Sequence, residues 1–210
     1  FSEKPPYTLD DEVQANLDEL LEMIESADMF AVISFRTGPG RSEFSVCCFD
    51  EAGDWYEEDK LNNEVWRNAQ AQKAWAEMWR YTANRYKNNP IVVGYDLMVE
   101  PNSNEVWLNE WNPEDFYEDH GGTLYDWNKL HPQITEAIRE VDTQTPILIG
   151  GMAYSAFDWL PYLEPTGDPR TVYVAHQYAP YVYTHQWHGT AIEYPGKLDL
   201  NWDGRLDDFN

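Results

Sequence analysis

The sequence predicts an α/β fold built around a parallel sheet. Short apolar runs alternate with amphipathic helical segments along the chain, and each run ends in polar or glycine residues. The most regular run extends from Pro90 to Met98, and Glu100 and Pro101 follow it closely. A near-continuous apolar run between turn residues is typical of a strand that is buried on both faces, as in a parallel sheet.

The predicted elements of the first half are, in chain order, a helix from about Asp10 to Ile24, a strand over 29–35, a long helix from about Asn62 to Tyr86, and the strand over 90–98. Thr8 supplies a hydroxyl that should cap the first helix, and acidic residues in the first turn favour its start. Its apolar side chains recur at helical spacing. A Gly-Pro-Gly loop follows the first strand, and residues 42–61 look irregular and acidic.

The predicted elements of the second half are a long loop over 102–124, a helix from about Asp126 to Val141, a strand over 147–151, a short helix over 157–163, a strand over 171–176, and a loop over 177–210. Strands that alternate with helices predict right-handed crossovers. Four strands do not close a barrel, so a doubly wound sheet also fits this pattern. The glycine-rich phosphate loops of nucleotide-binding proteins are absent from the sequence.

The composition narrows the choice of partners. The 210 residues suffice for one domain or a large part of one. The chain has 38 acidic and 14 basic residues, a net charge of −24, which repels phosphate backbones and anionic lipid and argues against nucleic acid and membrane partners. A neutral polysaccharide meets no such repulsion. Aromatic residues make up 15% of the chain, so we expect some of them to line a groove.

Distinctive groups stand at the ends of the predicted strands. They are Arg36, Glu100, Gly150-Gly151, and His176 with Tyr178. In a parallel barrel such strand ends open into one mouth, where barrel enzymes hold their catalytic groups. An arginine, an acid, a histidine and a tyrosine in an aromatic-walled groove suit glycoside chemistry. The acid protonates the leaving oxygen, and the other polar groups hold sugar hydroxyls.

Three segments are similar to motifs of one known family. They are 95–101 (Tyr-Asp-Leu-Met-Val-Glu-Pro), the helix over 79–90 that precedes it, and His176-Gln177-Tyr178. The family's fourth strand ends in Asn-Glu-Pro, whose Glu is the acid/base, and its sixth strand ends in His-x-Tyr, whose Tyr contacts the nucleophile. On these motifs the chain resembles glycoside hydrolase family 5, the cellulase family, from about residue 8 to about residue 196.

The resemblance implies a (β/α)8 barrel and a retaining mechanism with Glu100 as the catalytic acid/base. Residues 1–210 would form a single domain, the central part of the barrel and an incomplete portion of it, because a complete barrel takes about 250 residues. A retaining site needs two carboxyl groups about 5–5.5 Å apart. The family's nucleophile is a Glu after the seventh strand, and the sequence contains no such strand. Glu193 could be proposed instead, but it lies in a predicted loop.

Two positions differ from the family's motifs. Val99 stands where the family has an Asn that binds the sugar 2-hydroxyl, and Arg36 stands where the third strand usually brings a His. We expect a retaining endo-β-1,4-glycanase of cellulase type that acts on β-glucan. The alternative is a catalytically inactive carbohydrate-binding barrel. The resemblance also implies an extracellular protein, a polysaccharide or oligosaccharide partner, and a monomer once the barrel is complete.

The remaining site residues are predicted from their residue types and positions. The expected substrate-binding residues are Arg36, His176, Tyr178, Trp107, Tyr154 and Trp187. The family implies no cofactor for catalysis, but the tail could hold a structural calcium ion. Asp199, Asn201, Asp203 and Asp207 occupy ligand positions of a calcium loop, with Gly204 at its turn. Asn210 stands where a bidentate Glu is expected.

Overall fold

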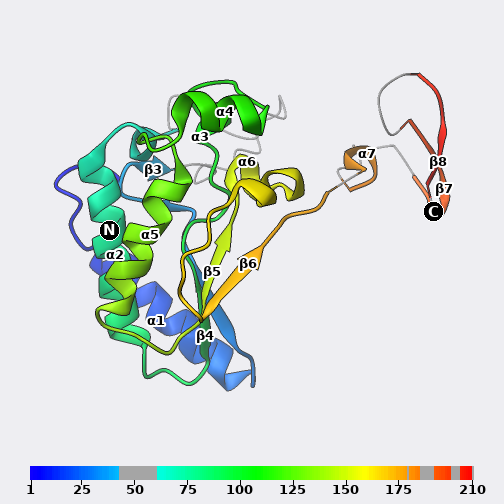
Figure 1. Cartoon of the computed structure of the whole chain (residues 1–210). Coiled ribbons are helices and arrows are strands. Elements are labelled where there is room, and N and C mark those ends of the chain that lie inside the picture. Colours follow the sequence, from blue (N-terminus) through cyan, green and yellow to red (C-terminus); the bar gives the residue numbers. More distant parts are fainter. Residues whose placement is uncertain (43–60, 179, 185–191, 200–203, 210) are drawn as a thin grey trace. The chain divides into compact units, whose positions relative to one another are not determined.

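Four parallel strands form the central sheet of the computed structural model (Figure 1). The structure describes residues 1–42, 61–178, 180–184, 192–199 and 204–209, in two compact units, Phe1–Ala175 and His176–Asn210. The sheet belongs to the first unit and consists of β1 (Ala31–Ser34), β4 (Val92–Asp96), β5 (Ile147–Gly150) and β6 (Thr171–Val174). The spatial order β1-β4-β5-β6 follows the chain order. This is the order of a barrel, whereas a doubly wound sheet reverses its direction.

All four strands lie inside the segments that the sequence predicts as strands. Burial on both faces, which the run over 90–98 predicts, is wrong for β4, and β1 and β6 also expose valines. Val93 is 42% exposed, Val32 46% and Val172 47%. The reason is that the two long helices α2 (Ala69–Tyr86) and α5 (Trp127–Arg139) pack against each other and lie on the same side of the sheet (Figure 1).

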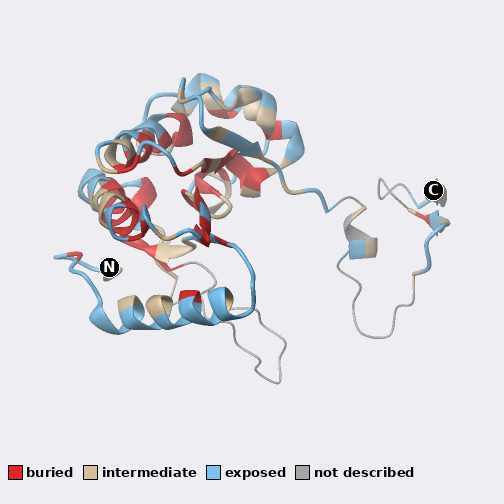
Figure 2. Ribbon diagram, turned by 90° about the horizontal axis from the view of Figure 1, so that it is seen from below, coloured by how far each residue is buried: buried red, intermediate tan, exposed pale blue. Residues whose placement is uncertain are grey.

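The other helices of the first unit are α1 (Asp11–Ser26), η2 (Glu64–Trp66), α3 (Ser103–Val106), α4 (Pro113–His120), α6 (Met152–Ser155) and η3 (Phe157–Tyr162). A small antiparallel hairpin, β2 (Thr37–Gly38) with β3 (Arg41–Ser42), follows β1. Figure 2 shows that the buried residues gather where the helices meet the sheet, while α1 is largely exposed.

Three predicted boundaries are wrong. The cap of α1 is Asp10, whose carboxylate accepts hydrogen bonds from the N–H groups of Glu12 and Val13, while the backbone of Thr8 pairs with Ser2 before the helix begins. The long second helix is two elements, since Asn68 caps a new start after η2. The expected loop over 102–124 contains α3 and α4.

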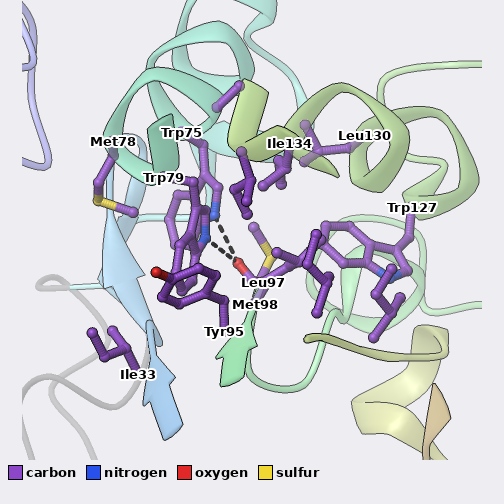
Figure 3. Packing of buried hydrophobic residues seen from close by; sticks show 14 of the residues in the cluster. Ile33, Trp75, Met78, Trp79, Tyr95, Leu97, Met98, Trp127, Leu130 and Ile134 are labelled. Atoms are coloured by element: carbon purple, nitrogen blue, oxygen red, sulfur yellow. Dashed lines mark hydrogen bonds between the residues drawn. The ribbon is translucent and has the colours of Figure 1, made fainter. Parts of the chain in front are cut away.

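The core is rich in tryptophan. Trp75 and Trp79 of α2 are fully buried, and their indole N–H groups both donate to the backbone carbonyl of Leu97, at 3.0 and 2.7 Å (Figure 3). These bonds satisfy two buried donors and fix the chain just beyond the end of β4. The helix-facing side chains of the sheet, such as Tyr95 and Ile147, complete the same cluster.

The second unit contains α7 (Tyr181–Thr184) and an antiparallel pair, β7 (Gly196–Leu198) with β8 (Asp207–Phe209). The sequence predicts a loop here, so the hairpin is a further difference. In the part of the chain that the structure describes, no helix is long and apolar enough to cross a membrane.

Candidate active site

The backbone beyond β4 is held from three sides. The carbonyl of Leu97 accepts the two indole hydrogen bonds, and the N–H of Val99 donates to the carbonyl of Phe35 at 3.1 Å. Arg41 of β3 donates to the carbonyls of Val99 and Glu100, both at 2.8 Å. The segment that carries Glu100 is thereby tied to the segment that follows β1.

Glu100 and Arg36 form an ion pair. Nη2 of Arg36 lies 2.8 Å from Oε2 of Glu100, and the two side chains are 34% and 12% exposed. Glu100 has φ of 56°, a left-handed conformation that is uncommon outside glycine and asparagine. The structure thus brings two of the predicted site residues together at neighbouring strand ends. At the last residues of β1 and β4, the hydroxyl of Ser34 donates to the carboxylate of Asp96 at 2.8 Å.

Tyr154 also reaches this loop. Its N–H donates to the carbonyl of Pro101 at 2.9 Å, and its hydroxyl donates to the carboxylate of Glu105 and accepts from the amide of Asn102. Ala153, Tyr154 and Ser155 have φ of 54°, 63° and 60°. A run of left-handed residues stores strain, and such strain clusters at functional sites. Through its hydrogen bonds, Tyr154 therefore stabilises the loop that follows Glu100.

A cation covers one face of the Trp107 ring. Its indole N–H donates to the carbonyl of Asn63 at 2.8 Å, and the guanidinium of Arg67 lies 4.2 Å from the ring centroid. The cation occupies one face of the ring, so only the other face could meet a sugar. Trp187, the remaining predicted aromatic contact, lies outside the described residues.

His176 and Tyr178 belong to the second unit. Their rings meet edge to face, with centroids 6.2 Å apart, and Tyr178 is 47% exposed. Their roles in a shared site with Glu100 stay predictions.

The predicted calcium residues are only partly described. Asp199 follows β7 and its carboxylate accepts a hydrogen bond from the N–H of Gly204 at 2.9 Å, while Asp207 begins β8. Asn201 and Asp203 lie outside the described residues. Among the residues that are described, no three His, Cys, Asp or Glu side chains gather as metal ligands would. The calcium site remains a prediction.

Sequence reasoning missed Arg41 and Asn102, which are both fully buried beside Glu100. The available signal for Arg41 is the Gly-Pro-Gly turn directly before it, which marks a tight hairpin. Asn102 lies two residues beyond Glu100 in the same strand-end motif. Its position at a strand end could have marked it in the same way as Glu100.

Comparisons with known proteins show which family the chain resembles. A family model described as Cellulase (glycosyl hydrolase family 5) matches residues 1–209. Endoglucanase C of Acetivibrio thermocellus is 29% identical over 154 residues, which cover 68% of this chain and 39% of that protein. The major extracellular endoglucanase of Xanthomonas campestris pv. campestris is 24% identical over 162 residues, 70% of this chain and 31% of that protein.

The structure is similar to solved endoglucanases. Thermotoga maritima Cel5A in complex with cellobiose superposes with a TM-score of 0.61 at 21% identity, over 91% of this chain and 49% of that one. The same protein with mannotriose gives a TM-score of 0.61 at 20% identity, over 90% and 49%. The chain therefore spans less than half the length of these relatives. The predicted fold, an incomplete portion of a (β/α)8 barrel, is confirmed. The chain belongs to the cellulase family, glycosyl hydrolase family 5.

Proposed function

We propose that the chain is part of a retaining endo-β-1,4-glucanase in which Glu100 is the catalytic acid/base. The observation that carries the proposal is the carboxylate of Glu100, fixed at the end of β4 and paired with Arg36. Acidic groups at the carboxyl ends of barrel strands are where barrel enzymes perform their chemistry. Family membership and the endoglucanase relatives support the reaction class.

In the first step, the proton on the Glu100 carboxyl passes to the glycosidic oxygen as the bond to C1 breaks. A second carboxylate forms the new bond to C1 and gives a covalent glycosyl-enzyme. In the second step, Glu100 as carboxylate takes a proton from the water whose oxygen attacks C1, while the bond between C1 and the second carboxylate breaks and frees that carboxylate. The second carboxylate would come from a further barrel strand of the full-length protein.

The acidic charge of the chain and the sugars bound by its relatives support a neutral polysaccharide as the substrate. The acidic surface disfavours anionic polymers, and related structures hold cellobiose and mannotriose. We propose a β-glucan, with β-mannan as the nearest competitor. The protein acts outside the cell in this proposal, as the name of the Xanthomonas relative indicates for that protein. Arg36, Tyr154, His176 and Tyr178 are proposed to contact the sugar.

A carbohydrate-binding barrel without catalysis is the second candidate. The ion pair favours it, because Arg36 occupies one oxygen of the carboxylate that would have to carry the proton. Val99 also favours the binding barrel, since its side chain offers no amide group to bind a sugar hydroxyl.

Replacing Glu100 with Gln in the full-length protein tests the proposal. Turnover of a soluble cellulose derivative should fall by about 10²–10⁴-fold, the usual contribution of a general acid. Glu77→Gln is the matched control, because Glu77 is an exposed glutamate paired with Arg80 on α2. Unchanged turnover in the Glu100 variant would exclude the acid role. Oligosaccharide binding without turnover in the wild type would establish the second candidate.

A further inference from the structure

The hairpin after β1 is fitted tightly onto α2 and η2. A side chain at Gly38 would place its Cβ 2.9 Å from atoms of both Trp75 and Met78, and one at Gly40 would meet Ala71 and the backbone of Val65 at 2.8 Å. Gly40 also has φ of 71°, which other residues rarely adopt. Its carbonyl accepts from the N–H of Val65 at 2.8 Å. The tight packing at Gly38 and Gly40 therefore fixes where the hairpin lies on α2 and η2. It also fixes the position of the next residue, Arg41.

Arg41 is fully buried. Its Nη1 donates to the carbonyl of Val99 and its Nη2 to the carbonyl of Glu100, each at 2.8 Å. The guanidinium is planar and rigid, so its two terminal nitrogens can hold two acceptors at a fixed separation, which an ammonium group cannot do.

These two carbonyls belong to the two peptide planes that flank the Cα atom of Glu100. Rotation of the first plane about N–Cα is φ, and rotation of the second about Cα–C is ψ. By holding both planes, Arg41 determines the direction of the Cα–Cβ bond of Glu100. The residue is left-handed, with φ of 56°, a state that an unrestrained glutamate would leave.

We propose that Arg41 is a positioning residue for the carboxylate of Glu100. The two bonds that carry this role run from the buried guanidinium to backbone carbonyls. Arg41 acts through the backbone, and the Gly38–Arg41 hairpin is the device that places it. The catalytic consequence rests on the proposed function of Glu100, while the backbone consequence does not.

The test compares Arg41→Met and Arg41→Lys in the full-length protein, with Arg80→Met on the exposed face of α2 as the control. On cello-oligosaccharides, kcat of the Met variant should fall by about 100-fold at an almost unchanged KM, because a small misplacement of a catalytic group has that effect. Single-turnover release of dinitrophenol from an activated aryl cellobioside should stay within about threefold, since that leaving group needs little proton donation. The Lys variant should recover part of the loss.

Two further measurements separate positioning from a general structural role. Adding Arg41→Met to Glu100→Gln should cause no further loss of kcat, because both changes act through one carboxylate. Hydrogen exchange of the peptide that contains 97–102 should be faster in Arg41→Met and unchanged in α5. Equal losses on both substrates, additive losses in the double variant, or unchanged exchange would each overturn the proposal. If Glu100→Gln is fully active, the proposed function fails, and the exchange experiment still decides whether Arg41 holds the turn.

Discussion

Glu100 has a backbone conformation that its neighbours must maintain. The sequence located it correctly after an apolar strand, because strand ends can be read from residue patterns. Its partner could not be read in the same way. The chain has 38 acidic residues and 14 basic ones, and the pairing of Arg36 with Glu100 depends on the parallel alignment of β1 with β4.

His131 gives a prediction about pH and stability. It is fully buried in α5, neither ring nitrogen has a hydrogen-bond partner in the described structure, and burial lowers its pKa to about 4. The unfolded chain, with a histidine pKa of about 6.5, binds more protons than the folded one between these values. Stability should therefore fall as the pH drops through this range, by about 2 kcal/mol between pH 7 and 5.

Urea unfolding at pH 7 and pH 5 checks this expectation. In His131→Phe the pH-dependent loss should be smaller than in the wild type by that amount, since phenylalanine cannot bind a proton. If the free energy of unfolding changes with pH by the same amount in the two proteins, His131 contributes nothing to acid sensitivity.

At the scale of elements, the four strands and the two long helices were predictable because their apolar periodicity is strong. The errors fell where local signals compete. Thr8 and Asp10 are both good caps; in the structure Asp10 caps the helix, and the backbone of Thr8 pairs with Ser2 ahead of it. The segment over 113–120 looked like loop because of its Asn-Pro start. Proline is in fact favoured at the first position of a helix, and the fully buried Phe116 anchors that turn.

The cap of α5 gives a prediction at this scale. The carboxylate of Asp126 accepts from the N–H of Asn128 at 2.8 Å and of Gly122 at 2.7 Å, and Asp126 is almost fully buried. Asp126→Ala should lower the free energy of unfolding by about 1–2 kcal/mol, because the helix cap and the acceptor for the N–H of Gly122 are both lost from a nearly buried position. Asp10→Ala, which removes an exposed cap from α1, should have a smaller effect in the same denaturation experiment. Equal effects would refute the role of burial.

At the scale of the whole molecule, the order of strands decides the architecture. A pattern of alternating strands and helices fits both a barrel and a doubly wound sheet, so the sequence pattern alone left both open. The order β1-β4-β5-β6 and the match to half of a solved barrel select the first. The expected meeting of His176 and Tyr178 with Glu100 rests on closure of a whole barrel, which local patterns do not encode, and it stays a prediction.

The open edges of the sheet lead to a prediction about association. Within the described residues, β1 and β6 each pair on one side only, and apolar side chains such as Val32, Val172 and Tyr173 are exposed along them. Unpaired edges recruit further strands. Residues 1–210 produced alone should associate as their concentration rises, whereas the full-length protein should sediment as a monomer. A monodisperse monomer of residues 1–210 in sedimentation experiments would contradict this.

The paired indoles of Trp75 and Trp79 also change how the backbone is bonded just after β4. A carbonyl oxygen has two lone pairs, and at Leu97 both face indole N–H groups from α2. That oxygen is saturated and can accept nothing from an adjacent strand. The backbone at and after it stays tied to its neighbours through N–H groups, from Leu97 to Leu148 of β5 and from Val99 to Phe35. A helix thus replaces an adjacent strand as the hydrogen-bonding partner of this carbonyl, directly before the turn that presents Glu100.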